Sequence, residues 1–333
     1  MSEVGIRAKL AFLRRPASYP GEPRGVQVVE THMSWVFLTD RDAYKLKKAV
    51  RYDCIDFSTP ELRRHDCEEE LRLNRRLAPE VYLRVVPLTF DAGGNLALDG
   101  VGEPVDWLVH MRRLPADRML DQLIRRGAVE EADVRPAAER LARFYAGAAP
   151  SELTAGAYRE RLAAGVREDL HELSRPEFGL PVARASALAD AQRAFLAREA
   201  ELFDRRVREG RIIEGHGDLR PEHICLTPEP AIIDCLEFSR DLRVLDPADE
   251  LAFLALECER LGKPGVGAWF FQVYAELSGD QPPVALLRFH RTYRAMRRAK
   301  IAIWHLRDPG VREKGKWRER ALQYLELATP LRS

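Results

Sequence analysis

Alternating apolar and polar residues in the first third of the chain predict a run of strands joined by turns. Val26 to Glu30, Trp35 to Thr39 and Ala43 to Lys47 are short and rich in β-branched and aromatic residues, and the polar residues 40–42 join the last two. Further strands of this kind are expected at Tyr82 to Thr89, Leu96 to Leu98 and Asp106 to Met111.

Helical periodicity appears once among these strands and then fills most of the remaining chain. Thr59 is a suitable N-cap and Pro60 a suitable first residue for a helix that continues to about Leu77. Later helices are expected at Val134 to Ala146, Tyr158 to Leu173, Ala183 to Arg208, and through most of Pro264 to Pro330. Strands first and helices afterwards indicate an α+β protein.

Composition narrows the class of protein. The chain has 333 residues, enough for two lobes, and its formal net charge of +1 argues against a general nucleic-acid binder. The five cysteines show no CxxC pair, which is typical of reduced thiols in the cytosol. No apolar run approaches the length of a membrane span, and the first residues do not look like a secretion signal. We therefore expect a cytoplasmic protein without a membrane or nucleic-acid partner.

The segment 216–238, HGDLRPEHICLTPEPAIIDCLEF, contains the candidate chemistry. Two short apolar runs separated by a proline-bearing turn predict a small hairpin, with Asp218 in the loop before it and Asp234 at its end. Two such carboxylates suit phosphoryl transfer, in which one accepts the proton of a hydroxyl and the other holds a metal ion. The alternative for Asp218 is a loop aspartate that caps a neighbouring turn.

HGDLRPEH resembles the catalytic loop of the protein-kinase-like superfamily, and IIDCLEF resembles its metal-binding segment. The HGD form is found in the aminoglycoside phosphotransferase and choline kinase branch. This resemblance implies a bilobal fold with a small antiparallel-sheet N-lobe, residues 1–113, and a larger helical C-lobe, residues 114–333. It also implies ATP and Mg²⁺ as cofactors and a small-molecule acceptor.

The same resemblance implies roles for the residues of this segment. Asp218 would be the catalytic base, Arg220 would neutralise the transferring phosphoryl group, and Asp234 would bind the metal. His223 stands where the family has a metal-binding Asn. Because Mg²⁺ prefers oxygen ligands, His223 would bind Mn²⁺ instead, hydrogen-bond a phosphate, or leave one metal site weaker.

Several residues earlier in the chain complete the implied nucleotide site. Lys45 is the candidate phosphate lysine and Lys47, on the same strand face, is the alternative. Glu70 would pair with the lysine, whereas a second interpretation makes both lysines solvated edge residues. Ser34 would cover phosphates in place of the missing glycine-rich loop, and the alternative is that residues 31–34 form an ordinary hairpin turn. Met111 would lie at the hinge that holds adenine. We expect Asp218 and Asp234 to face each other across the terminal phosphates, with Lys45 closing the third side.

Residues around the hairpin supply supporting features. Within DPADELA, Glu250 takes the position of the family acid that braces the catalytic loop, and His216 is expected to brace the same loop. Tyr293, Arg297 and Lys300 share one helix face, with Arg294 and Arg298 widening a basic arc. An anionic acceptor would suit this arc, and the alternative is ion pairing to acidic neighbouring helices.

Three functions fit these patterns. The first is an ATP-dependent kinase of a small-molecule hydroxyl. The second is a nucleotide-binding pseudokinase or regulatory module, favoured by His223 and by the missing glycine loop. The third, a protein kinase, is disfavoured because the stretch between Asp234 and Asp249 is too short for an activation segment.

Overall fold

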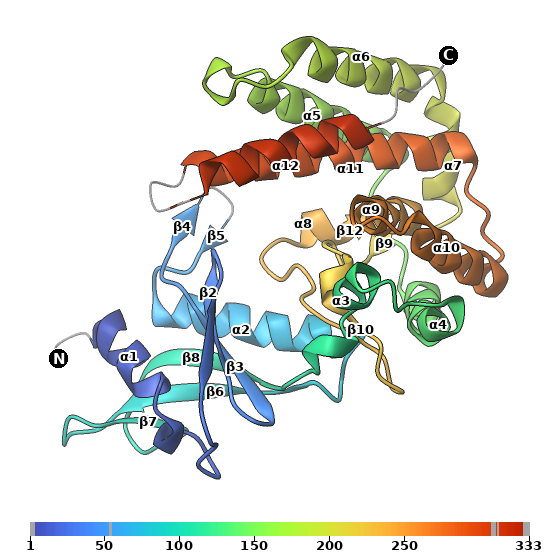
Figure 1. The fold of residues 1–333 in the computed structure, drawn as a ribbon. Coiled ribbons are helices and arrows are strands. Elements are labelled where there is room, and N and C mark those ends of the chain that lie inside the picture. Colours follow the sequence, from blue (N-terminus) through green and yellow to red (C-terminus); the bar gives the residue numbers. More distant parts are fainter. Residues whose placement is uncertain (1–3, 53–54, 308–310, 312, 329–333) are drawn as a thin grey trace. The chain divides into compact units, whose positions relative to one another are not determined.

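The computed structural model describes residues 4–52, 55–307, 311 and 313–328. It divides into two compact units (Figure 1): unit 1 is Met1–Met119 with Ile224–Arg240, and unit 2 is Leu120–His223 with Asp241–Ser333. The sequence-based division after Arg113 concerns nucleotide and acceptor binding, and it stays a prediction.

Unit 1 is built on a six-stranded antiparallel sheet of strand order β1-β2-β3-β8-β6-β7. Its strands are β1 Gln27–Glu30, β2 Ser34–Leu38, β3 Asp42–Lys47, β6 Tyr82–Phe90, β7 Leu96–Leu98 and β8 Glu103–Arg112. The short pairs β4 Arg51–Tyr52 with β5 Ile55–Asp56, and β10 Ile224–Cys225 with β11 Ala231–Ile232, lie outside this sheet. The helices are α1 Ile6–Leu13 and α2 Pro60–Asn74.

Side chains of strand β3 alternate between two apolar layers, and this alternation decides where its lysines point. Tyr44 and Leu46 pack with Phe12 and Leu13 of α1. Ala43, on the opposite face, belongs to a second cluster that includes Cys67 of α2 and Cys225 of the β10–β11 hairpin. Because side chains two residues apart share a face, Lys45 and Lys47 lie on the side of the sheet that α2 covers.

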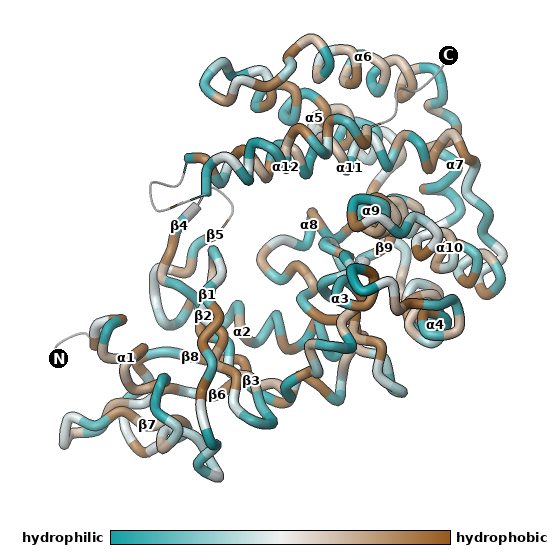
Figure 2. The backbone as a smooth tube through the Cα atoms, viewed as in Figure 1, coloured by the Kyte–Doolittle hydropathy of each residue, from teal (hydrophilic) through white to brown (hydrophobic). Residues whose placement is uncertain are grey.

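Unit 2 is helical and has a large apolar core. Its helices are α3 Leu120–Arg125, α4 Glu131–Gly147, α5 Ala155–Leu173, α6 Val182–Arg198, α7 Ala200–Arg208, α8 Arg240–Arg243 (which begins at the last residue of unit 1), α9 Pro247–Arg260, α10 Pro264–Ser278, α11 Val284–Trp304 and α12 Lys314–Leu327. The antiparallel pair β9 Ile213–Glu214 and β12 Val244–Leu245 flanks the 216–223 loop in the sequence. Figure 2 shows apolar and polar residues alternating along these elements.

The predicted α+β class, with an antiparallel sheet in one part and helices in the other, is confirmed. The single helix expected over Ala183 to Arg208 is wrong. Glu199, with φ −105° and ψ 29°, leaves the helical conformation and separates α6 from α7. The helix after Thr59 ends at Asn74, earlier than expected, and Thr59 Oγ1 accepts a hydrogen bond from Leu62 N at 3.3 Å as a cap.

The predicted reduced state of the cysteines holds for the four that the structure describes, Cys67, Cys225, Cys235 and Cys258, which are free and buried. Cys54 lies outside the described residues. Among the helices of the described part of the chain, none combines the length and the apolar character that a membrane span requires.

Candidate functional site

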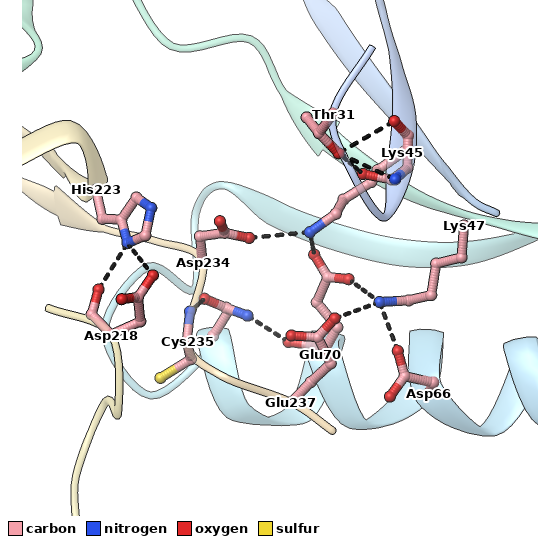
Figure 3. A network of polar contacts seen from close by, with 12 residues as sticks. Thr31, Lys45, Lys47, Asp66, Glu70, Asp218, His223, Asp234, Cys235 and Glu237 are labelled. Carbon is pink, nitrogen blue, oxygen red and sulfur yellow. Dashed lines mark hydrogen bonds and ion pairs between the residues drawn. The ribbon is translucent and has the colours of Figure 1, made fainter. Parts of the chain in front are cut away.

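Two lysines of β3 share one buried glutamate of α2 (Figure 3). Lys45 Nζ lies 2.9 Å from Glu70 Oε1, and Lys47 Nζ lies 2.7 Å from Glu70 Oε2. The Glu70 side chain has no exposed surface, so each of its oxygens is neutralised by a different lysine. The pairing expected between the strand lysine and Glu70 is present, and it involves both candidates rather than one.

Lys47 contacts two further carboxylates. Asp66 Oδ2 lies 2.6 Å and Glu237 Oε1 2.5 Å from its Nζ, which is almost completely buried. Burial alone would lower the pKa of Lys47, but Glu237 and Glu70 outweigh it and hold the pKa well above its usual value. The interpretation of the strand lysines as solvated edge residues is therefore wrong, because both side chains end in a buried ion-pair network.

Lys45 also reaches the segment that follows strand β11. Its Nζ lies 2.9 Å from Asp234 Oδ1, and 43% of the Asp234 side chain is exposed. Burial alone would lower the pKa of Lys45, but Asp234 and Glu70 together raise it well above its ordinary value. Lys45 thus connects a fully buried acid to a partly exposed one.

The backbone at Asp234 is held in an uncommon conformation. Its φ of 61° is in the left-handed region, which is uncommon for a non-glycine residue and which Asp tolerates better than most. Asp234 N–H donates to the Tyr82 hydroxyl at 3.1 Å, and Cys235 N–H donates to Asn74 Oδ1 at 2.9 Å. Asn74 in turn donates to the Glu70 carbonyl at 2.8 Å. Helix α2 and strand β6 therefore hold the backbone of residues 234 and 235 in this conformation.

In unit 2, Asp218 lies within a small polar group of its own loop. Arg220 Nε donates to Asp218 Oδ2 at 3.0 Å. His223 Nδ1 lies 2.8 Å from the Asp218 carbonyl (Figure 3). Arg220 Nη2 lies 2.9 Å from His223 Nε2. Because a carbonyl accepts and a guanidinium donates, these contacts assign the proton of neutral His223 to Nδ1 and make Nε2 the acceptor.

Glu250 of α9 supports the backbone of this loop. Its Oε2 accepts from His216 N–H at 3.1 Å and its Oε1 from Gly217 N–H at 2.6 Å. The Tyr145 hydroxyl donates to the same carboxylate at 2.7 Å. His216 Nδ1 accepts from Asp218 N–H at 3.3 Å. The bracing roles expected of Glu250 and His216 are confirmed.

Positive charge around Asp218 controls its ionisation. Burial alone would raise the pKa of Asp218, but the positive charges of Arg220 and Arg298 outweigh this effect and hold the pKa below its usual range. Asp218 is therefore a carboxylate at neutral pH, able to accept a hydrogen bond from a hydroxyl group.

Ser34 and Met111 both lie in the six-stranded sheet, at the start of β2 and near the end of β8. Ser34 is buried and its Oγ lies 2.9 Å from Thr31 Oγ1, so it helps to hold the turn between β1 and β2. Met111 lies near the end of β8, pairs with Ala43 and Tyr82, and belongs to the apolar cluster on the lysine face of the sheet.

The basic arc of α11 is largely neutralised by acids. Arg294 donates to both Asp249 oxygens at 2.8 and 2.7 Å, Arg297 donates to Asp169 at 3.3 Å, and Lys300 lies 2.7 Å from Asp169. The ion pairing that we gave as the alternative is present. These three bases therefore give no support to an anionic acceptor.

Sequence reasoning found Glu70 but missed Asp66 and Asn74 of α2 and Tyr82 of β6. Asp66 and Asn74 lie four residues before and after Glu70 on the same helix face, a signal that was present in the sequence. The contact of Tyr82 with Asp234 N–H had no local signal because the two residues are distant along the chain.

Asp234 and His223 differ in how well their side chains suit a divalent cation. In the described part of the chain, no group of three His, Cys, Asp or Glu side chains has the arrangement of a metal site. The partly exposed oxygens of Asp234 match the preference of Mg²⁺. The two ring nitrogens of His223 face the Asp218 carbonyl and Arg220, so a cation at Nε2 would have to displace Arg220.

Comparison with known protein sequences finds relatives that are themselves uncharacterized. No family model matches the chain. Uncharacterized proteins of Mycobacterium tuberculosis (strain H37Rv) and Mycobacterium bovis are each 36% identical over 282 residues, which cover 83% of this chain and 54% of theirs. The chain thus spans about half the length of these curated relatives.

Solved structures match nearly the whole chain. The GDP complex of aminoglycoside 2'-phosphotransferase-IIIa aligns at a TM-score of 0.53 and 16% identity, covering 97% of this chain and 98% of that one. A choline/ethanolamine kinase family protein from Mesorhizobium loti aligns at 0.56 and 14%, covering 97% and 99%. The AMP complex of LicA aligns at 0.54 and 16%, covering 98% and 100%. The chain therefore has the fold shared by aminoglycoside phosphotransferases and choline kinases.

Proposed function

We propose that the protein is an ATP-dependent phosphotransferase that moves the γ-phosphate of ATP to a hydroxyl of a small molecule. The observation that carries this proposal is the contact of Lys45 with both Glu70 and Asp234. A lysine held by one buried acid and directed at a second, partly exposed acid suits the binding of phosphates together with their metal ion.

Lys45 would bind the nucleotide phosphates, and Glu70 would keep its ammonium group in place. The fixed backbone of Asp234 supports its proposed role as ligand of Mg²⁺, which neutralises charge on the phosphates when it is bound. Ser34 is proposed to cover the phosphates from the β1–β2 turn. The apolar cluster around Met111 and Val109 is proposed to receive the adenine ring.

Asp218 would accept the hydrogen bond of the attacking hydroxyl and then its proton. Its pKa, held below the usual range, keeps it ionised before the reaction. Arg220, which donates to the Asp218 carboxylate, is proposed to balance the charge of the transferring group. Glu250 does not touch the reacting atoms and acts by holding the backbone of the loop.

A small-molecule acceptor is proposed because the fold is that of kinases whose names specify small molecules, aminoglycosides and choline among them. The buried free cysteines support a proposed cytoplasmic location.

A second candidate function is nucleotide binding without turnover. It is favoured by one observation: Arg220 and the Asp218 carbonyl engage both nitrogens of His223, at the position where an oxygen ligand for a second metal was expected. Mn²⁺, which accepts nitrogen ligands more readily than Mg²⁺, is the proposed alternative metal for an active enzyme.

Two measurements on the full chain separate these functions. Thermal unfolding with ATP and either Mg²⁺ or Mn²⁺ reports binding, because a ligand of the folded state raises the melting temperature. ATP consumption over a panel of hydroxyl-bearing metabolites and aminoglycosides then reports turnover. Binding followed by acceptor-dependent consumption supports the kinase, whereas binding without consumption on any acceptor supports the second function.

A further inference from the structure

Arg298 differs from the other bases of helix α11. Arg294, Arg297 and Lys300 each make close contacts with a carboxylate, at 2.8, 3.3 and 2.7 Å respectively. The two carboxylates that face Arg298 are farther away. Glu257 Oε1 lies 3.5 Å from its Nε, and Asp218 Oδ1 lies 4.0 Å from its Nη1.

The acids near Arg298 are already engaged by other groups. Glu257 accepts from the Tyr324 hydroxyl at 2.6 Å and from Arg260 Nε at 2.7 Å. Asp218 Oδ2 accepts from Arg220 at 3.0 Å. Arg298 is therefore an additional cation in a group whose carboxylates have closer partners.

The guanidinium of Arg298 is nevertheless mostly buried. Its side chain is 18% exposed, and its carbon Cζ lies 5.7 Å from the centroid of the Phe253 ring and 5.8 Å from that of Tyr324. The Tyr324 hydroxyl interacts with it as well. Its Nε is buried and makes no hydrogen bond to the described residues. Aromatic rings thus hold the group in place, and its Nε donor is left without a hydrogen bond.

A buried guanidinium in this state needs an oxygen-rich partner, because burying unsatisfied charged donors is unfavourable. The side chain keeps some exposed surface, and its Nη1 lies 4.0 Å from Asp218 Oδ1, too far for a hydrogen bond but beside the proposed base. We propose that Arg298 binds an oxyanion, a phosphate or carboxylate group, that lies next to Asp218 during the reaction. This inference rests on the proposed function for the role of Asp218, but not for the binding of the anion.

Such an oxyanion has two possible sources. It is either the phosphoryl group in transfer or an anionic substituent of the acceptor close to the hydroxyl that Asp218 binds. In both cases the planar guanidinium would donate two parallel hydrogen bonds, which lysine cannot reproduce. The second source would make the acceptor a hydroxylated carboxylate or phosphate ester.

The test measures the affinity of inorganic phosphate for the full chain by calorimetry. Arg298→Gln removes the charge and is expected to weaken phosphate binding about tenfold or more, since charge-assisted hydrogen bonds are lost. Arg298→Lys preserves the charge and the fold and is expected to give an intermediate loss. Arg288→Gln, at an exposed arginine of the same helix, is the matched control and leaves the affinity unchanged.

Equal phosphate affinity in the wild type, Arg298→Gln and Arg298→Lys would overturn the proposal, as would a wild type that binds no phosphate. ATP hydrolysis with water as acceptor then separates the sources. A slower hydrolysis in Arg298→Lys identifies the phosphoryl group, whereas unchanged hydrolysis with a raised KM for the acceptor identifies a substituent of the acceptor. If the wild type neither binds nor consumes ATP, the proposed kinase function fails while the phosphate measurement remains readable.

Discussion

Lys45 Nζ lies 2.9 Å from Asp234 Oδ1, and 189 positions separate these two residues in the sequence. The same ammonium group contacts Glu70 at 2.9 Å. Lys45→Met is expected to weaken ATP binding about tenfold or more, because the charge-assisted contacts to phosphate are lost. Equilibrium binding of ATP with Mg²⁺ checks this. Lys48→Met is the control, and equal losses in the two variants would contradict the assignment of Lys45.

Lys47 is expected to contribute mainly to stability. It is buried against Asp66, Glu70 and Glu237, so Lys47→Met leaves these acids without their shared cation. Removing one partner of a buried ion pair costs about 3–5 kcal/mol of unfolding free energy. Urea denaturation of Lys47→Met should show a loss of this size. Lys48, whose partner Glu30 is largely exposed, should give about 0–1 kcal/mol on substitution.

Glu250 is expected to affect turnover without affecting nucleotide affinity. Glu250→Gln replaces one acceptor oxygen by an NH₂ group, which cannot accept from the backbone N–H groups of His216 or Gly217. The loop should shift, and a small misplacement of Asp218 lowers kcat by about tenfold or more. Steady-state kinetics of Glu250→Gln and of the control Glu259→Gln, on the same helix, test this. A fall in ATP affinity with kcat unchanged would be evidence against it.

The pH dependence of turnover should report the charge near Asp218. The pKa of Asp218 is below its usual range, so the wild-type base is deprotonated at neutral pH. It becomes protonated only as the pH falls through this lowered pKa. Arg220→Gln removes a cation that lowers this pKa, so the acid limb of kcat/KM should move to higher pH. Arg205→Gln, at an exposed arginine, should leave the limb in place. If the acid limb of kcat/KM in Arg220→Gln stays at the wild-type pH, a group other than Asp218 determines that limb.

The order of strands and helices was predictable because their periodicities and caps are local. Thr59 and Pro60 marked the start of α2 correctly. The break between α6 and α7 was not predicted, because Glu199 is neither Gly nor Pro and so gives no local signal of a helix end.

The candidate site was only partly accessible from sequence. Period-two alternation placed Lys45 and Lys47 on one face, but it could not show that both would reach Glu70. Tyr82 accepts from Asp234 N–H and Asn74 from Cys235 N–H, and both contacts join segments that are distant in the sequence. The expected approach of Asp218 to Asp234 stays a prediction, and so do the roles of Ser34, Met111, Arg220 and His223.

The measurement that bears most directly on the proposed chemistry compares turnover and nucleotide binding in Asp218→Asn. This change keeps the size of the side chain and removes its ability to take a proton. ATP consumption with a productive acceptor should fall at least about a hundredfold, while the affinity for ATP stays within about threefold of the wild type. Undiminished consumption by Asp218→Asn would contradict the assignment of Asp218 as the base.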